Sequence, residues 1–180
     1  MLYHQVSFHK DKFIMNHEQS DERDHVDALL AQWARERPDL DCWPMAIFGR
    51  VARMAALAGR DIDEGIKEQG LASGEFDVLA TLRRAGEPLT PTALYQSTML
   101  TSGAMTARLD KLERQGWIAR QPSPCDRRSL LVALTDEGRA VIDKAVAAHV
   151  HNEWRLLDPL SEAEQRQLAD LLRRWLRAYE

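Results

Sequence analysis

The stretch LTSGAMTARLDKLERQG, residues 100–116, decides the fold of this chain. Met105, Leu109 and Leu112 are spaced three and four residues apart in it, so they form one apolar stripe of a helix. The stretch ends in glycine, which readily adopts the backbone conformation that stops helices. A shorter helix-initiating run, PTALY, precedes it at residues 91–95. Two short helices with a tight connection predict a helix-turn-helix.

After residue 116 the hydrophobic period changes from helical to strand-like. The runs WIAR (117–120) and LLVAL (130–134) suit two strands, and the intervening QPSPCDRR (121–128) is a proline-broken loop with arginines at its tip. Two strands around such a loop form a β-hairpin wing. We therefore predict a mainly α fold with a small β-hairpin, a winged helix-turn-helix, which points to DNA.

These segments resemble the MarR family of bacterial transcription regulators. DRR (126–128) followed by VALTDEG (132–138) resembles the wing signature of that family, and RLDKLERQG (108–116) resembles its recognition helix. The resemblance extends from about residue 32 to the C-terminus. It implies a homodimeric DNA-binding regulator, a repressor rather than an enzyme, that binds a palindromic operator.

The run QWARERPDLD (32–41) resembles the extra first helix of the urate-responsive PecS group within that family. In that group a tryptophan, an aspartate and two arginines hold an anionic aromatic ligand. The matching residues here are Trp33, Asp77, Arg108 and Arg120. The resemblance thus implies release from DNA by a small effector such as urate or a phenolic compound, with no cofactor.

The chemistry of these four side chains supports that role, although a simpler role is open. Two guanidinium groups can bind a delocalised anion through charge-assisted hydrogen bonds, and an indole supplies a stacking wall. A bound anion would repel Asp77 and could move the recognition helix, which would weaken operator affinity. Alternatively, Asp77 and Arg108 form a structural salt bridge, Arg120 is a solvated strand end and Trp33 is a packing residue.

The residues expected to contact DNA are Thr101, Ser102, Thr106, Arg127 and Arg128. The first three lie at the start of the recognition helix, where short hydroxyl side chains can reach base edges or phosphates. The two arginines at the wing tip suit the negative potential of a minor groove. A helix-capping role for the first two hydroxyls, and an ion pair between one arginine and the adjacent aspartate, are the alternatives.

Helical patterns flank the winged unit on both sides. We expect helices over residues 21–37, 44–68, 73–86, 136–156 and 162–179, with Ser73 and Thr135 as N-caps and a Ser161–Glu164 capping box. The expected inner faces are Ile47, Val51, Met54, Ala55 and Ala58 in the second of these helices and Phe76, Leu79 and Leu82 in the third. Leu168, Leu171, Leu172 and Trp175 line the last helix.

The expected organisation has four parts. Residues 1–17 form a flexible extension, 18–70 the N-terminal helices of a dimerisation region, 71–138 the winged helix-turn-helix, and 139–180 the C-terminal dimerisation helices. A two-fold dimer of the terminal helices would place two recognition helices about 34–36 Å apart, the spacing of successive major grooves.

The charge distribution fits a DNA-binding protein better than the net charge of −4 does. Residues 101–130 hold six basic and three acidic side chains, whereas residues 18–41 hold eight acidic and three basic ones. Because phosphate attraction depends on the charge at the contact surface, a basic lobe on an acidic molecule is compatible with DNA binding.

Other classes of protein are less well supported by the sequence. No apolar run approaches a membrane span, and we expect a cytoplasmic protein. Cys42 and Cys125 give no disulfide framework, but Cys125 lies near the wing arginines, so a cysteine-based redox switch is an alternative to the effector. His149 and His151 are two residues apart on a helix and point to different faces, so no metal site is expected. A winged helix without ligand response is the remaining alternative.

Overall fold

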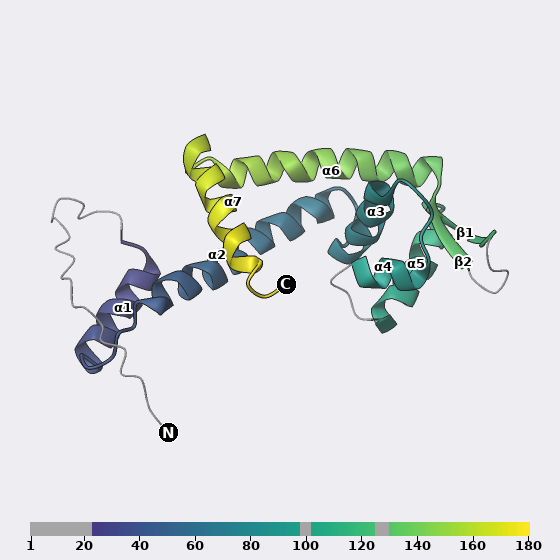
Figure 1. The fold of residues 1–180 in the computed structure, drawn as a ribbon. Helices are drawn as coiled ribbons and strands as arrows, with labels where there is room; N and C mark the ends of the chain where they lie inside the picture. The colour runs from purple at the N-terminus through teal and green to yellow at the C-terminus, as the bar shows by residue number, and fades with distance from the viewer. Residues whose placement is uncertain (1–22, 98–101, 125–129) are drawn as a thin grey trace, which may run out of the picture. The chain divides into compact units, whose positions relative to one another are not determined.

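The computed structural model describes residues 23–97, 102–124 and 130–180, as seven helices and one antiparallel hairpin (Figure 1). The described elements fall into two compact units, one up to Arg53 and one from Met54 onward, and the second helix runs through the boundary. Their bounds are α1 His25–Glu36, α2 Pro44–Glu68, α3 Ser73–Ala85, α4 Pro91–Ser97, α5 Ser102–Arg114, β1 Ile118–Pro122, β2 Leu130–Leu134, α6 Asp136–Leu157 and α7 Glu162–Leu176. The predicted mainly α fold with a β-hairpin wing is confirmed.

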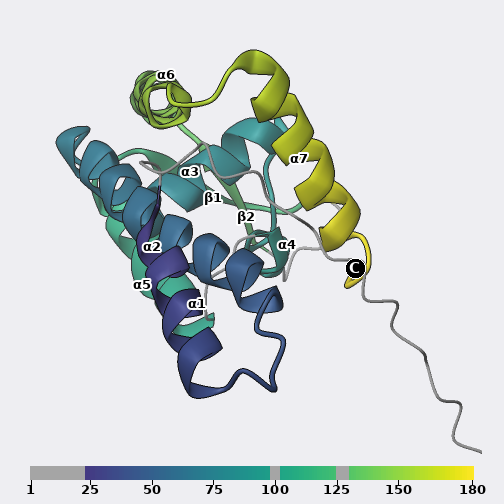
Figure 2. The ribbon, with the colours of Figure 1, turned by 90° about the vertical axis from the view of Figure 1, so that its left-hand side faces the viewer.

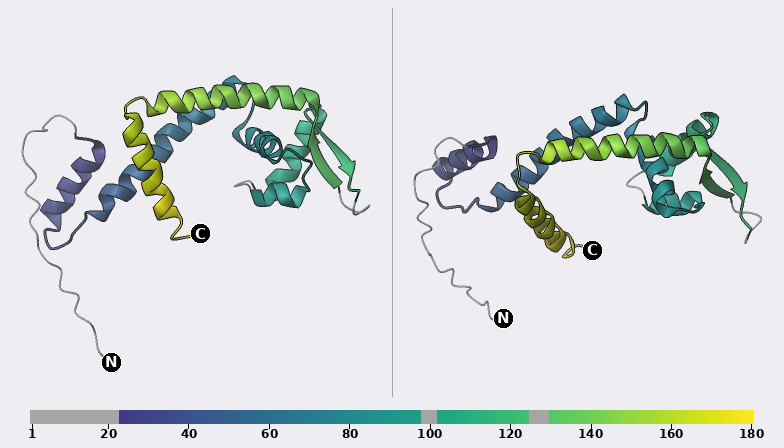
Figure 3. Two further views of the ribbon diagram at one scale, coloured as in Figure 1. Left: turned by 45° about the horizontal axis from the view of Figure 1, so that its top comes forward. Right: turned by 90° about the horizontal axis from the view of Figure 1, so that it is seen from above.

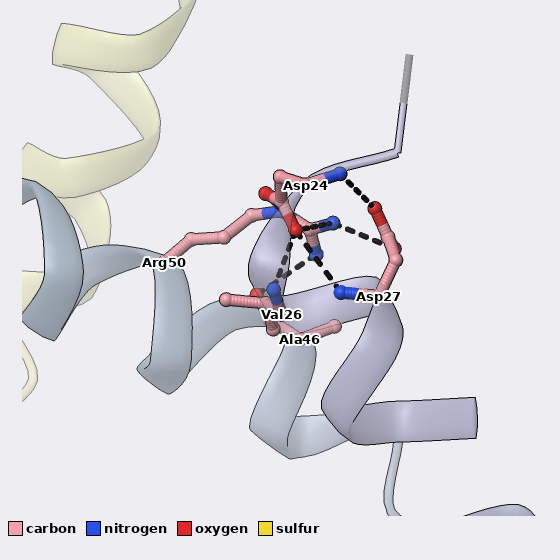
Figure 4. Close-up of polar contacts among 5 residues, drawn as sticks. All are labelled: Asp24, Val26, Asp27, Ala46 and Arg50. Atoms are coloured by element: carbon pink, nitrogen blue, oxygen red, sulfur yellow. Dashed lines mark hydrogen bonds and ion pairs between the residues drawn. The ribbon is translucent and has the colours of Figure 1, made fainter. Parts of the chain in front are cut away.

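In the first unit, α1 is joined to the start of α2 by one arginine and two aspartates (Figure 4). Asp24 is the N-cap of α1 and accepts hydrogen bonds from the N–H groups of Val26 and Asp27 at 2.8 and 3.0 Å. Arg50 donates to both carboxylates, with 2.8 Å from its Nε to Asp24 and 2.8 Å from its Nη2 to Asp27. The helix therefore begins later than residue 21, at the position that this aspartate can cap.

The second unit has its core around α3, which contacts α4, α5, β2 and α6. Figure 2 views this unit along the axis of α6. The predicted inner faces of α3 (Phe76, Leu79, Leu82) and α5 (Met105, Leu109, Leu112) are all buried, which confirms the helical periodicity of both segments. These two faces join Leu94, Ile118, Val132 and Ile142 in a single hydrophobic core.

The N-cap of α3 differs from the expected one. The cap position is Ala72, and Ser73 is the first helical residue. The hydroxyl of Ser73 donates to the carboxylate of Asp63 on α2, so it is not available to cap its own helix. The Glu75 carboxylate instead accepts the N–H of Ala72 at 3.1 Å. At the other end Gly86 stops the helix with a φ of 72°, as predicted.

The predicted hairpin is confirmed as an antiparallel pair, and in its register Ile118 lies opposite Leu134. Leu89, just before α4, exchanges two backbone hydrogen bonds with Val132 at 3.0 and 2.7 Å and so anchors the hairpin to the helix-turn-helix. The chain enters β1 through Gly116, whose φ of 73° ends the recognition helix.

The start of α6 is fastened directly to the beginning of the wing. Thr135 caps α6 as predicted, accepting the N–H of Gly138 at 2.9 Å and donating to the carbonyl of Gly116 at 2.7 Å. A Cβ on Gly138 would lie 1.8 Å from the carbonyl oxygen of Trp117, so glycine is required for this close approach.

The terminal helices keep apolar side chains on their surface. The expectation that Ile47, Val51 and Met54 are buried is wrong for the single chain, in which they are 49%, 41% and 56% exposed. Ala55 is exposed and Ala58 partly buried. Helical periodicity identifies an apolar face of α2 but not the surface that covers it.

The last helix, α7, follows α6 after a short turn and lies at the end of α6 opposite to the hairpin (Figures 1 and 3). Its Ser161–Glu164 capping box is confirmed, but it ends at Leu176 rather than residue 179. Its predicted stripe of leucines is exposed. No helix in the described part of the chain is long and apolar enough to cross a membrane.

Candidate nucleic-acid interface and ligand cavity

The recognition helix α5 is held against α3 by a charged contact at its buried side. The ammonium group of Lys111 forms an ion pair with the carboxylate of Glu75, whose side chain is only 5% exposed. The same carboxylate caps α3 through the N–H of Ala72. A buried carboxylate needs a partner to offset its lost hydration, so the Lys111 contact fixes α5 relative to the start of α3.

A second charged contact joins the recognition helix to the wing. Arg120 of β1 donates from Nη2 to Asp110 at 2.6 Å and from Nη1 to Glu113 at 2.7 Å. Its backbone N–H also donates to Glu113, at 3.3 Å. Its guanidinium group is thus occupied by two carboxylates of α5, an arrangement that sets the angle between wing and recognition helix.

Of the residues predicted to contact DNA, two lie within the described part of the chain. Thr106 is exposed on α5, at the edge of the buried face that Met105 and Leu109 form. Ser102 is the first residue of α5. Thr101, Arg127 and Arg128 lie outside the described residues, as does Cys125.

A cavity of about 320 Å³ lies between α3, the end of α4 and α6. One helix, α3, supplies most of its polar wall: Asp77, Thr81 and Arg84 follow each other at four and three residues and so share a face. The complete lining is Phe76, Asp77, Ala80, Thr81, Arg84, Ser97 and His149.

Asp77 is the electrostatic centre of this cavity. Burial raises the pKa of its carboxyl above the ordinary value of 3.8, and the positive charges of Arg108 and Arg84 partly oppose that rise. Among the described residues Asp77 forms no ion pair with Arg108, so the salt bridge considered as the simple alternative is absent.

Arg108 approaches the cavity from the recognition helix. Its guanidinium packs on the backbone of α3, where a Cβ on Gly74 would lie 2.1 Å from its Nε. Its Nη1 is buried and makes no hydrogen bond to any described group. A buried charged donor without an acceptor is costly.

His149 of α6 completes the wall, and its place there was not predicted from the sequence. Its ring lies 4.9 Å from that of Phe76, and its Nε2 is 3.2 Å from a carboxylate oxygen of Glu153. Its Nδ1 is buried and makes no hydrogen bond to any described group. The spacing of Asp77, Thr81 and Arg84 was a signal in the sequence, whereas nothing local links His149 to Phe76.

Comparison with known proteins identifies the class of regulator. Residues 69–129 match the sequence profile described as MarR family. The chain is 43% identical over 151 residues to the HTH-type transcriptional regulator PecS of Dickeya dadantii, covering 83% of this chain and 91% of PecS. The chain belongs to the MarR family. The resemblance to the family and to PecS is therefore confirmed, and the protein is a DNA-binding transcriptional regulator, as its relatives are, and not an enzyme.

Solved structures of MarR proteins have the same fold. A mutant MarR from E. coli complexed with operator DNA superposes with a TM-score of 0.64 at 29% identity, covering 76% of this chain and 99% of that one. BpsR of Bordetella bronchiseptica, studied for regulation of its DNA binding by 6-hydroxynicotinic acid, superposes with a TM-score of 0.61 at 25% identity and covers 71% of this chain and 91% of that one.

The structure of this MarR-family protein places the four predicted ligand residues in different settings. Asp77 lines the cavity and Arg108 lies beside it, while Arg120 binds carboxylates of α5. Trp33 lies on α1 in the first unit and is 42% exposed. Their joint role in binding a ligand stays a prediction.

The cysteines of the alternative redox switch are Cys42 and Cys125, and the structure describes the first of them. Cys42 is a half-buried free thiol in the first unit. Within the described ranges, no three His, Cys, Asp or Glu side chains are grouped so that they could hold a metal ion.

Proposed function

We propose that this MarR-family regulator binds a palindromic operator as a homodimer, represses the adjacent gene, and leaves the DNA when a small anionic aromatic effector enters the cavity at Asp77. The observation that carries the effector part is the cavity itself. The half-buried carboxylate of Asp77, whose pKa is raised by burial, lines it. Arg108 of the recognition helix lies near that carboxylate and has a buried nitrogen with no acceptor among the described groups.

The dimer is supported by the apolar surface of the terminal helices. On α7 alone, Leu168, Leu171, Leu172 and Leu176 are 42%, 46%, 42% and 56% exposed along one face. Leucines at this spacing are the face that a helix buries against a partner. A second copy of the chain supplies the same surface under two-fold symmetry and pairs two recognition helices for two half-sites. The MarR complex with operator DNA, which has the same fold, supports the use of α5 on DNA.

The effector would act through the contacts between α3 and the recognition helix. An anion held by the Arg108 guanidinium would be repelled by the Asp77 carboxylate, so its binding favours a different spacing of α3 and α5. Arg108 is itself a residue of α5, and the Glu75–Lys111 ion pair transmits any movement of α3 to the same helix. A ligand that prefers this shifted arrangement lowers operator affinity by its differential affinity for the two states.

The test is release of the gene's own upstream DNA by a panel of urate, xanthine and hydroxybenzoates, followed by gel shift at several salt concentrations. We expect wild type to be released by at least one compound, and Asp77→Asn to bind DNA normally but respond weakly. Asp170→Asn, an exposed carboxylate of α7, is the matched control and should respond like wild type.

An unchanged effector response of Asp77→Asn would refute the proposed cavity. Release by an oxidant and by none of the compounds would move the switch to Cys42 or Cys125. Trp33→Phe and Arg108→Ala, tested in the same assay, show whether the other predicted residues take part, provided that Arg108→Ala still binds DNA.

A further inference from the structure

We infer that His149 determines the specificity of the effector cavity, and that the effector carries a ring N–H or phenolic O–H that donates a hydrogen bond to His149 Nδ1. This inference rests on the proposed effector function and narrows it. It assigns the effector to donor-bearing aromatic anions, as opposed to aromatic carboxylates that only accept hydrogen bonds.

The partner of His149 Nε2 determines which of the two ring nitrogens carries the hydrogen. Nε2 lies 3.2 Å from Glu153, and an ionised carboxylate can only accept, so Nε2 carries the hydrogen of the neutral ring. Nδ1 is then left with its lone pair. It is buried, and no described group donates to it. The wall of α6 therefore presents a fixed, unused acceptor.

Packing holds that acceptor in place. The imidazole lies against the ring of Phe76, with centroids 4.9 Å apart and planes inclined by 50°. Together with the Glu153 contact this fixes two sides of the ring. A buried acceptor held in one orientation without a donor is unfavourable for the empty protein, and a ligand donor relieves that cost.

Cationic donors lie on or near the part of the cavity wall that α3 forms. Arg84 lines it, and Arg108, whose Nη1 is a buried donor without an acceptor, lies near the same carboxylate, Asp77. The hydroxyl of Thr81 already accepts from Arg84 Nη2 at 3.1 Å. His149 Nδ1, in contrast, is a buried acceptor to which no described group donates. A ligand complementary to both walls has an anionic group at one edge and a donor at another.

Such a site discriminates strongly between otherwise similar molecules. A site built to hydrogen-bond a ligand O–H or N–H rejects the analogue that lacks it, because the buried protein group then stays unpaired. Discrimination between matched ligands is thus the property that His149 should control, separately from the ability to bind an anion.

The experiment uses matched ligand pairs on the full-length protein. Benzoate is compared with 3- and 4-hydroxybenzoate, and nicotinate with 6-hydroxynicotinate, whose pyridone form has a ring N–H. Affinities are measured by isothermal titration calorimetry, and operator release by gel shift. We expect wild type to bind the preferred donor-bearing member at least about tenfold more tightly than its partner.

Two variants separate hydrogen bonding from packing. His149→Phe keeps an aromatic ring against Phe76 and removes both nitrogens, and it should abolish the preference while leaving the affinity for the donor-free anion within about twofold of wild type. His149→Asn can place an acceptor at the δ position and should retain part of the preference. It also serves as the readable variant if His149→Phe loses its fold.

The inference and the proposed function fail in different ways. Equal affinities of wild type for both members of every pair, or an undiminished preference in both His149 variants, overturn the role of His149 while the effector site stands. If no compound binds wild type, or binding occurs without operator release, the proposed effector function fails and the inference fails with it.

Discussion

The winged unit and the terminal helices carry the same sequence pattern with opposite outcomes. Leu109 of α5 and Leu171 of α7 both belong to apolar stripes with three- and four-residue spacing, yet they are 2% and 46% exposed. The first stripe meets α3, β1 and α4 within its own chain. The second is left open. The core of the winged unit is thus completed within one chain, with the help of Ile142 of α6, whereas the stripe of α7 stays exposed in the single chain.

The largest expected effect is on the stability of the winged unit, whose apolar stripe is buried. Leu112→Ala removes a fully buried side chain between α5 and the hairpin, and it should lower the free energy of unfolding by about 2–5 kcal/mol. Leu171→Ala, the same change on an exposed stripe, should cost less than about 1 kcal/mol in dilute, monomeric protein. Urea unfolding followed by circular dichroism measures both. Equal losses would remove the contrast between the two regions.

The next effect tests the buried charge of the winged unit. Lys111→Met leaves the Glu75 carboxylate buried without its cation, and should destabilise the protein by about 1–3 kcal/mol in the same urea assay. Lys144→Met, on an exposed site of α6, is the control and should change stability little. A Lys111→Met protein as stable as this control would show that the ion pair does not hold α5.

A smaller effect is expected for the exposed stripe of α7, where a substitution should change dimerisation and not folding. Leu171→Glu puts a charge on the exposed stripe of α7 and should raise the dimer dissociation constant at least about tenfold, or about 1.4 kcal/mol. Sedimentation velocity at several concentrations measures it. Ala163→Glu adds the same charge to an exposed position of α7 away from the stripe and should weaken the dimer less. Indistinguishable behaviour of the two variants would rule out this face as the interface.

The smallest effect concerns the pH dependence of the stability of the winged unit. Burial raises the pKa of Asp77 above 3.8, so the folded protein keeps this proton to higher pH than the unfolded chain does. Stability contributed by the protonated form is lost as pH rises from 3.8 through the raised pKa. Asp77→Asn should lack this decrease. Tm measured from acidic to neutral pH, beside Asp170→Asn, checks it, and parallel curves for wild type and Asp77→Asn would contradict it.

The contrast between the regions also explains what the sequence could predict. Contacts close along the chain leave a local pattern: the stripe of α5, the stop at Gly116 and the Ser161 capping box were all predicted and are present. The cap of α3 was assigned to Ser73, since nothing local showed that its hydroxyl binds Asp63. Whether a stripe is covered depends on distant surfaces, so the burial of α2 was predicted wrongly.

In the candidate site, too, contacts between residues far apart in the sequence could not be predicted. Asp77 and Arg108 were selected by resemblance and lie together in the structure. Arg120 was selected in the same way, but its partners Asp110 and Glu113 could not be deduced before the wing was placed on α5. His149 was missed because its neighbour Phe76 is far away in sequence, and the pairing arises only when α6 packs on α3.

The close approach of Gly138 to Trp117 has a mechanical consequence. The start of α6 packs directly on the backbone that leads into β1, and a Cβ at position 138 would force the two apart. The hairpin is therefore expected to move together with α6. If the proposed effector near His149, or a second subunit near α7, rotated α6, the wing would rotate with it. Gly138 thus permits the close contact through which a small rotation of α6 would reach the wing.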